Sequence, residues 1–191
     1  MKILFLIASI ILPIYSPILY VKAILGRKAK PHRTTRFVIL TTTILTTASL
    51  FAQHDQVALW LSFISMLQAI TIFSLSIKYG MGGWAKTDIL CLILASVGII
   101  MWRTTTNPVY GLYFGIVADI MGMIPTIIKT YHHPETEVWT FFTIDATAAV
   151  FNLFALSKWT IQSFSYPAYI WAINTLVALL ALRANGHKEA V

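Results

Sequence analysis

Residues 3–25 read ILFLIASIILPIYSPILYVKAIL, an apolar stretch whose one charged residue, Lys22, lies near its end. About 17–25 apolar residues form a helix long enough to cross the roughly 30 Å hydrocarbon core of a bilayer. The stretch could instead be a secretory signal peptide, because Lys2 precedes it. However, the apolar run continues past Pro13 and Pro17, and no small-residue cleavage site follows before the basic loop. We therefore expect a retained membrane-spanning helix.

The rest of the chain repeats this pattern. Hydrophobic residues make up 58% of the 191 residues and charged residues only 11%, whereas soluble domains carry about 25% charged residues. This composition excludes a disordered chain and makes an ordinary soluble enzyme a poor fit. We predict an all-α polytopic membrane protein with seven transmembrane helices. The expected spans are Ile3–Leu25, Phe37–Ala52, Val57–Ile77, Asp88–Trp102, Asn107–Ile128, Val138–Ser157 and Tyr166–Leu182. The second and fourth are short and reach spanning length only with Thr34–Arg36 and Arg103–Thr106.

The basic residues are distributed unevenly between the two sides that seven helices would define. Only Lys2, Arg103 and Lys158 fall on the side of the N-terminus. Cytoplasmic loops carry an excess of Lys and Arg, so we expect the N-terminus outside and the C-terminus in the cytoplasm, in a plasma or inner membrane. We expect these basic residues to lie beside the lipid bilayer and not to bind nucleic acid. The eleven basic residues of the other side are Lys22, Arg27, Lys28, Lys30, Arg33, Arg36, Lys78, Lys86, Lys129, Arg183 and Lys188.

Two halves of the chain share a weak internal repeat. Pro31 and Pro134 are 103 positions apart, as are Leu50 and Leu153, and each proline follows a basic loop. This spacing matches the first three spans to the last three and leaves the fourth as a linker. The linker gives both units the same orientation, so the repeats are parallel. We expect units at residues 1–77 and 107–191, joined by residues 78–106.

This 3+1+3 pattern resembles the SWEET and PQ-loop superfamily of small seven-helix membrane carriers. The local motifs are similar as well: Ser16-Pro17, Lys22 and the Lys28–Pro31 turn in the first half. The second half has Pro125, Lys129, Pro134 and Glu137. In contrast to the PQ-loop pattern, no glutamine follows either helix proline, since Ile18 and Thr126 stand there.

The resemblance implies a transporter of a small, largely uncharged polar solute, sugar- or vitamin-like, either facilitative or proton-coupled. It implies rocking of two three-helix units, with a possible homo-oligomer. In SWEET-like carriers a central asparagine in the third helix of each repeat lines the substrate pocket. Asn174 matches that position, and Gln68 stands where its first-repeat partner is expected.

Two acidic residues lie well inside predicted spans. Asp119 is 10 residues before Lys129, about 15 Å from that interface, and Asp145 is 8 residues after Glu137, about 12 Å deep. Acidic groups in hydrocarbon are costly and often belong to proton pathways. We predict proton coupling by Asp119, Asp145 or both, the alternative being a protonated acid that braces a neighbouring helix.

Further polar and aromatic residues are candidates for a substrate pocket. Asn152 lies mid-membrane in the sixth span, and Trp171 precedes Asn174 by three residues. Thr42 and Ser49 share a face of the second span, and the 103-residue spacing matches them to Asp145 and Asn152. Amides and hydroxyls suit an uncharged polar solute. They serve equally well as interhelical contacts or as bonds to their own helix.

Helix-breaking residues interrupt the first helix of each predicted unit: Pro13 and Pro17 in one, Gly122 and Pro125 in the other. Proline removes a backbone hydrogen bond and kinks a helix. Breaks in corresponding helices of two repeats often mark a gate or a binding region in transporters. We predict a hinge or gate there, with ordinary, tolerated membrane-helix prolines as the alternative.

Other classes of function are excluded or left open. The last span has no lysine for a retinal Schiff base, and no phosphate-binding glycine loop or recognisable nucleophile is present. His132-His133 with Glu135 fits no standard metal-ligand spacing, so we expect no metal and no cofactor. Two alternatives remain: a membrane enzyme that uses the Asp pair on a lipid-like substrate, and a sensor or assembly factor that acts through the basic Lys22–Arg36 loop.

Overall fold

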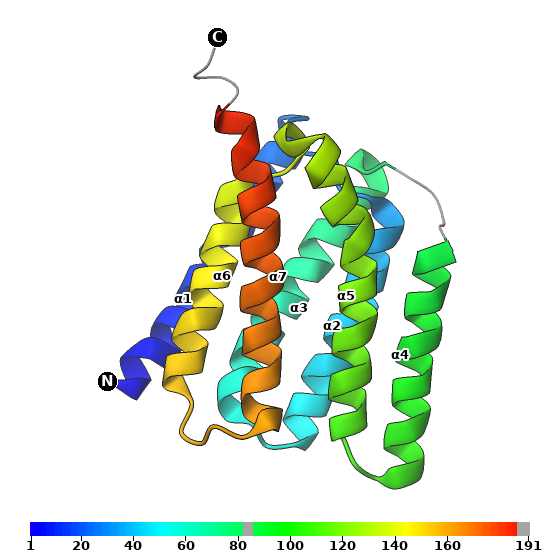
Figure 1. Cartoon of the computed structure of the whole chain (residues 1–191), viewed down its shortest axis with the longest axis vertical. Coiled ribbons are helices and arrows are strands. Elements are labelled where there is room, and N and C mark those ends of the chain that lie inside the picture. Colours follow the sequence, from blue (N-terminus) through cyan, green and yellow to red (C-terminus); the bar gives the residue numbers. More distant parts are fainter. Residues whose placement is uncertain (82–85, 187–191) are drawn as a thin grey trace.

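The computed structural model describes residues 1–81 and 86–186, without the side chains of 87, 88 and 184–186. Within these ranges the chain is all-α, as predicted, with seven helices and one short 3-10 turn (Figure 1). Lys188, which was counted in the charge distribution, lies outside the described residues. The elements are α1 (Lys2–Leu25), α2 (Arg33–Ala52), α3 (Gln56–Tyr79), α4 (Lys86–Thr105), α5 (Val109–His132), η1 (Pro134–Thr136), α6 (Trp139–Ala155) and α7 (Ile161–Gly186).

Five of these helices are long and apolar enough to cross a bilayer, namely α1, α2, α3, α5 and the Ile161–Arg183 part of α7. The apolar helices Ile89–Thr105 and Trp139–Ala155 are shorter. The chain is therefore a polytopic helical membrane protein by the length and composition of its helices.

Two helices begin earlier than the apolar pattern predicts, because polar side chains cap them. The His32 ring accepts a hydrogen bond from the backbone N–H of Thr35, so α2 starts at Arg33 instead of Phe37. The Thr160 hydroxyl accepts from the backbone N–H of Ser163, so α7 starts five residues before Tyr166. Such caps satisfy backbone donors that have no partner within the first helical turn.

Helices that are distant in the sequence pack side by side. Helix α1 packs against α6 and α3, while α5 packs against α2 and α7. Helix α2 also contacts α3, as α6 contacts α7, and α4 lies at the periphery against α5 and α2 (Figure 1). Glycine allows the α2–α5 approach, because a Cβ atom at Gly115 would lie 2.6 Å from Oγ1 of Thr46. Small residues at such crossings let helix backbones pack closely in membranes.

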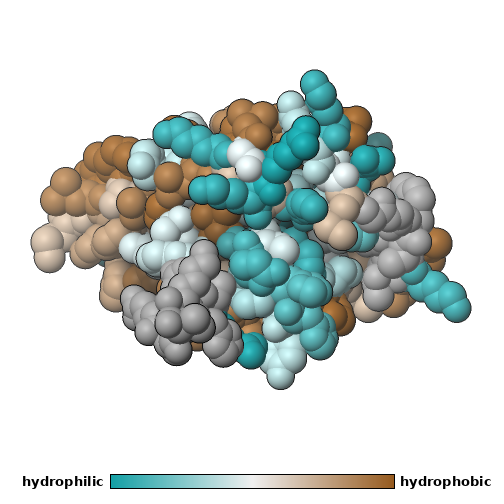
Figure 2. Space-filling view, turned by 90° about the horizontal axis from the view of Figure 1, so that it is seen from above, coloured by the Kyte–Doolittle hydropathy of each residue, from teal (hydrophilic) through white to brown (hydrophobic). Residues whose placement is uncertain are grey.

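One end of the bundle, which we term the basic end, holds the α1–α2 and α5–α6 connections and the end of α7 (Figure 1). Figure 2 views this end from above and shows hydrophilic side chains gathered across it. Exposed cations there include Lys28, Lys30, Lys78 and Arg183. The connection after α3 is tied to it, since Arg33 N–H donates to the Met81 carbonyl at 2.8 Å. Which side of a membrane the basic end faces remains a prediction.

The predicted hinge residues lie inside continuous helices. Pro13 and Pro17 are within α1, and Pro125 is within α5. A Cβ atom at Gly122 would lie 3.0 Å from a methyl carbon of Val38 on α2. This glycine therefore permits close helix packing, and the proposed hinge motion stays a prediction.

Candidate functional site

A small polar cavity of about 70 Å³ lies between α2, α3, α5, α6 and α7. Four of the residues singled out in the sequence line it together: Gln68, Asp119, Asp145 and Asn174. The cavity also contacts Arg36, Thr43 and Ser65, and its remaining walls are apolar. The bundle thus brings two acids and two amides from four different helices to one place.

Asp145 on α6 is held by donors from α1 and α3. Its Oδ1 accepts from the Ser16 hydroxyl at 2.6 Å and lies 3.2 Å from Nε2 of Gln68. The same Nε2 donates to the Pro13 carbonyl at 2.6 Å. That carbonyl lacks its usual helical donor, because Pro17 has no N–H. Pro17 and the buried Gln68 amide are thus parts of one arrangement around Asp145.

Asp119 on α5 has a comparable setting. Its Oδ1 accepts from the Thr42 hydroxyl of α2 at 2.7 Å, and its Oδ2 accepts from the Tyr169 hydroxyl of α7. Each acid therefore accepts hydrogen bonds from two other helices. Such donors stabilise an acid in a site that contains little water.

The two hydroxyl–acid pairs are related by one spacing in the sequence. Asp119 lies 103 positions after Ser16, and Asp145 lies 103 positions after Thr42. In one pair the Ser16 hydroxyl of α1 donates to Asp145 of α6. In the other pair the Thr42 hydroxyl of α2 donates to Asp119 of α5. The sequence pattern matched Thr42 to Asp145 by this spacing, whereas Ser16 was singled out only in the Ser16-Pro17 motif and not as a partner of an acid. Extending the same spacing to the first helix would have found it.

Asn152 and Ser49 lie outside the cavity, although both were candidates for its wall. Asn152 is fully buried, and its Nδ2 donates to the Val57 carbonyl at 2.9 Å and to the Ser9 hydroxyl at 3.2 Å. Ser49 donates to the Pro108 carbonyl. These hydrogen bonds join neighbouring segments toward the end of the bundle opposite the basic end. The two residues therefore have the interhelical role that was the alternative to a place in the pocket wall.

The two asparagines predict a contrast in stability. Replacing Asn152 by alanine should lower the unfolding free energy by about 1–2 kcal/mol, because two interhelical hydrogen bonds are lost. Asn174→Ala is the matched control, since Asn174 is half-buried and bonds only to the Ile170 carbonyl of its own helix. Unfolding of both variants in detergent measures the difference. Equal destabilisation would contradict the structural role of Asn152.

Trp171 also lies outside the cavity. Its side chain is 46% exposed on the outer surface of α7, in a groove with Thr147 and Thr175. Asn174, one turn away on the same helix, lines the central cavity, and Trp171 does not. Residues three apart on a helix differ in direction by about 60°, which here places them at different surfaces.

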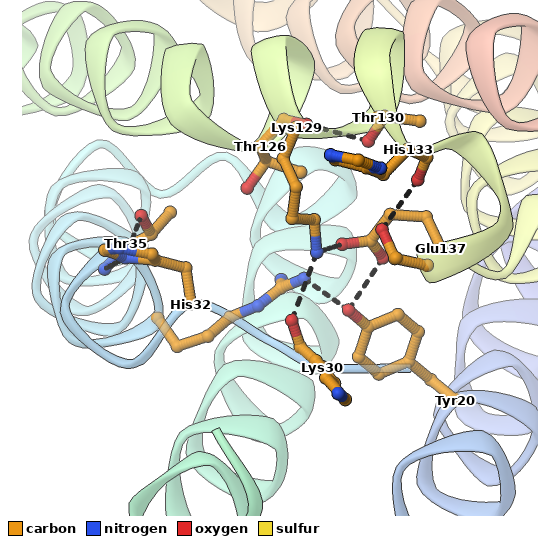
Figure 3. A network of polar contacts seen from close by, with 11 residues as sticks. Tyr20, Lys30, His32, Thr35, Thr126, Lys129, Thr130, His133 and Glu137 are labelled. Atoms are coloured by element: carbon orange, nitrogen blue, oxygen red, sulfur yellow. Dashed lines mark hydrogen bonds and ion pairs between the residues drawn. The ribbon is translucent and has the colours of Figure 1, made fainter. Parts of the chain in front are cut away.

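A network of charged and aromatic side chains closes the basic end of the bundle (Figure 3). Glu137 is buried and pairs with Lys129 at 2.5 Å through Oε1. Its Oε2 accepts from the Tyr20 hydroxyl at 2.7 Å, and that hydroxyl accepts from Nη2 of Arg36 at 2.9 Å. Lys129 also donates to the Lys30 carbonyl at 3.1 Å. The network therefore joins α1, α2 and α5 to the segment before α6.

Sequence analysis missed the roles of Tyr20 and Arg36. Arg36 was assigned to the basic loop, but it lies in the first turns of α2 and is only 6% exposed. Tyr20 is fully buried below it, with the guanidinium 5.2 Å from the ring centre. The sequence did contain a signal for this position of Arg36. If His32 caps the helix, α2 starts at Arg33 and Arg36 lies inside the span.

The histidine pair of the α5–α6 connection forms no ligand cluster. His133 lies 3.6 Å from Glu135, both exposed, while Glu137 points instead to Tyr20 and Lys129. Among residues 1–81 and 86–186, no group of three or more His, Cys, Asp or Glu side chains is placed to hold a metal ion.

These features define the class of protein: a polytopic α-helical membrane protein with a small acid-lined chamber inside its helix bundle. Comparison with known protein families, curated proteins and solved structures finds no match to this chain.

Proposed function

We propose that this protein is a proton-linked carrier of a small polar solute, built from two like-oriented three-helix units. The units are residues 1–77 and 107–191, with α4 as the linker. The helix contacts support this division, because α1 with α6 corresponds to α5 with α2. The spacing of 103 residues between the two hydroxyl–acid pairs supports it independently. The resemblance to the SWEET and PQ-loop superfamily points the same way.

The observation that carries the proposal is a pair of acids, both from the second unit, at a single cavity that is also lined by Gln68 from the first unit. Buried acids inside a membrane bundle are a common feature of proton and substrate pathways. Asp119 and Asp145 would exchange protons, while Gln68 and Asn174 would contact the solute. If the two acids served only to join helices, they would not both need to line the same cavity.

Transport would require the cavity to enlarge, because ligand pockets commonly measure about 300–1,000 Å³ and this one measures about 70 Å³. The pairing of Glu137 with Lys129 would act as the gate at the basic end. At the opposite end, the α2–α3 and α6–α7 connections line a surface hollow of about 470 Å³. Rocking of the two units would open one end at a time, with Pro17 and Pro125 as the flexible points of α1 and α5.

Uptake by reconstituted vesicles tests this function. We expect the wild-type chain to accumulate at least one small polar solute from a panel of labelled compounds when a pH gradient is imposed. Vesicles without protein set the background, and a folding check by size-exclusion chromatography accompanies each preparation. Folded protein that moves no solute with or without a gradient would contradict the proposal and favour the enzyme or sensor alternatives.

The predicted orientation is testable with single cysteines. In a Cys91→Ala background, Lys158→Cys should react with an impermeant thiol reagent added outside intact cells, because the α6–α7 connection is predicted to face outward. Lys28→Cys at the basic end should react only after the cells are permeabilised. Both positions are exposed in the structure. The reverse labelling pattern would place the basic end outside.

A further inference from the structure

Arg36 is a buried cation without a carboxylate in contact. Its side chain is 6% exposed, its Nη2 donates to the Tyr20 hydroxyl, and its Nε has no hydrogen-bond partner. Neither of the two ion pairs among the described residues includes Arg36. Burying a charge without a paired ion is costly, so such groups are usually paired in folded proteins.

The acids near Arg36 are already occupied. Glu137 reaches it only through the Tyr20 hydroxyl and is itself paired with Lys129. Asp119 is close enough for its charge to interact with that of Arg36. However, its two oxygens accept from Thr42 and Tyr169. Within the described part of the protein, Arg36 therefore has two carboxylates nearby but none within ion-pair distance.

Arg36 lines the same cavity as Asn174. A guanidinium is the side chain best suited to a carboxylate, because its planar N–H groups match the two carboxylate oxygens. One amide hydrogen of Asn174 bonds to the Ile170 carbonyl, and an amide nitrogen carries a second donor. The cavity thus combines a buried guanidinium, whose Nε has no hydrogen-bond partner, with a neighbouring neutral donor.

We propose that the central cavity binds a small monocarboxylate through Arg36, with Asn174 as a second donor. The inference rests on the proposed carrier function and revises the uncharged solute expected from the sequence. The cavity is small, at about 70 Å³, so two- and three-carbon carboxylates are the first ligands to test.

Thermal unfolding of the purified full chain in detergent tests the site without any transport assay. A ligand that binds only the folded state raises the Tm, and the rise grows with the logarithm of the ligand concentration once that concentration exceeds the Kd. We expect acetate and lactate to raise the Tm in a concentration-dependent way. Acetamide, the neutral isostere of acetate, should leave it unchanged at the same ionic strength, and gluconate, a much larger carboxylate, should raise it less than acetate does.

Substitutions locate the effect at Arg36. Arg36→Gln should weaken acetate binding about 30-fold or more, because the only charge that recognises the anion is removed. Arg36→Lys should retain part of the affinity, since the charge remains but the planar donor pair is lost. Lys28→Gln, an exposed cation of the same end, is the control and should bind acetate as the wild type does.

Three results would overturn the inference: no Tm response of the wild type to acetate or lactate, an equal response to acetamide, or unchanged binding by Arg36→Gln. If Arg36→Gln does not fold, two other measurements test the site. These are the comparison of acetate with acetamide on the wild type and the affinity of Arg36→Lys for acetate. Carboxylate binding without vesicle uptake would contradict the carrier and leave this site standing. Uptake of neutral solutes that carboxylates do not inhibit would contradict the site and leave the carrier.

Discussion

Replacing Lys129 by methionine is expected to lower the free energy of unfolding by about 3 kcal/mol. The Glu137 side chain is 1% exposed, and its Oε1 faces only Lys129. Methionine preserves the length of the side chain but leaves the carboxylate buried with Tyr20 as its remaining donor. Reversible unfolding in mixed micelles, or thermal unfolding in detergent, measures the loss.

A double-mutant cycle separates the ion pair from simple packing. Lys129→Met/Glu137→Gln should recover much of the stability lost in Lys129→Met, because no unpaired buried charge remains. Lys22→Met, which removes an exposed cation from the end of α1, is the matched control and should change stability by less than about 0.5 kcal/mol. If Lys129→Met behaves like Lys22→Met, the network at the basic end does not stabilise the fold.

Replacing Asp119 or Asp145 by asparagine is expected to abolish proton-driven accumulation in at least one of the two variants. A tenfold difference corresponds to one pH unit, so a gradient of two units can drive roughly 100-fold accumulation when one proton accompanies each solute. An amide of the same shape carries no exchangeable acidic proton. The variant should therefore equilibrate solute across vesicles without concentrating it.

The control for this experiment is Glu135→Gln, the same chemical change at an exposed position of η1. It should accumulate solute as the wild type does. Vesicle uptake with and without the imposed gradient, on variants that elute and unfold like the wild type, provides the measurement. Wild-type accumulation by both aspartate variants would mean that these acids serve only as hydrogen-bonded braces.

Sequence alone determined the helical membrane architecture, because a bilayer requires long apolar stretches and every backbone group must be bonded within its own helix. The apolar runs therefore predicted α1, α3 and α5 to within about two residues at their N-termini. Polar groups are costly in hydrocarbon and face the interior of a helix bundle. The four polar residues to which this applies line one cavity: Gln68, Asp119, Asp145 and Asn174. The depth of the two acids in the bilayer, counted from the predicted interfaces, stays a prediction.

Only the tertiary structure decided which inward-facing groups meet. Tyr20 and Glu137 are 117 positions apart, and Asn152 and Ser9 are 143 apart, so no local spacing predicts their contact. Lipid and protein interior are similarly apolar, and the hydrophobic pattern therefore says little about which helix face touches which neighbour. The packing of α1 against α6 and of α2 against α5 brings these partners together. The fold also places Asn152 in bonds between helices and leaves Trp171 exposed on α7.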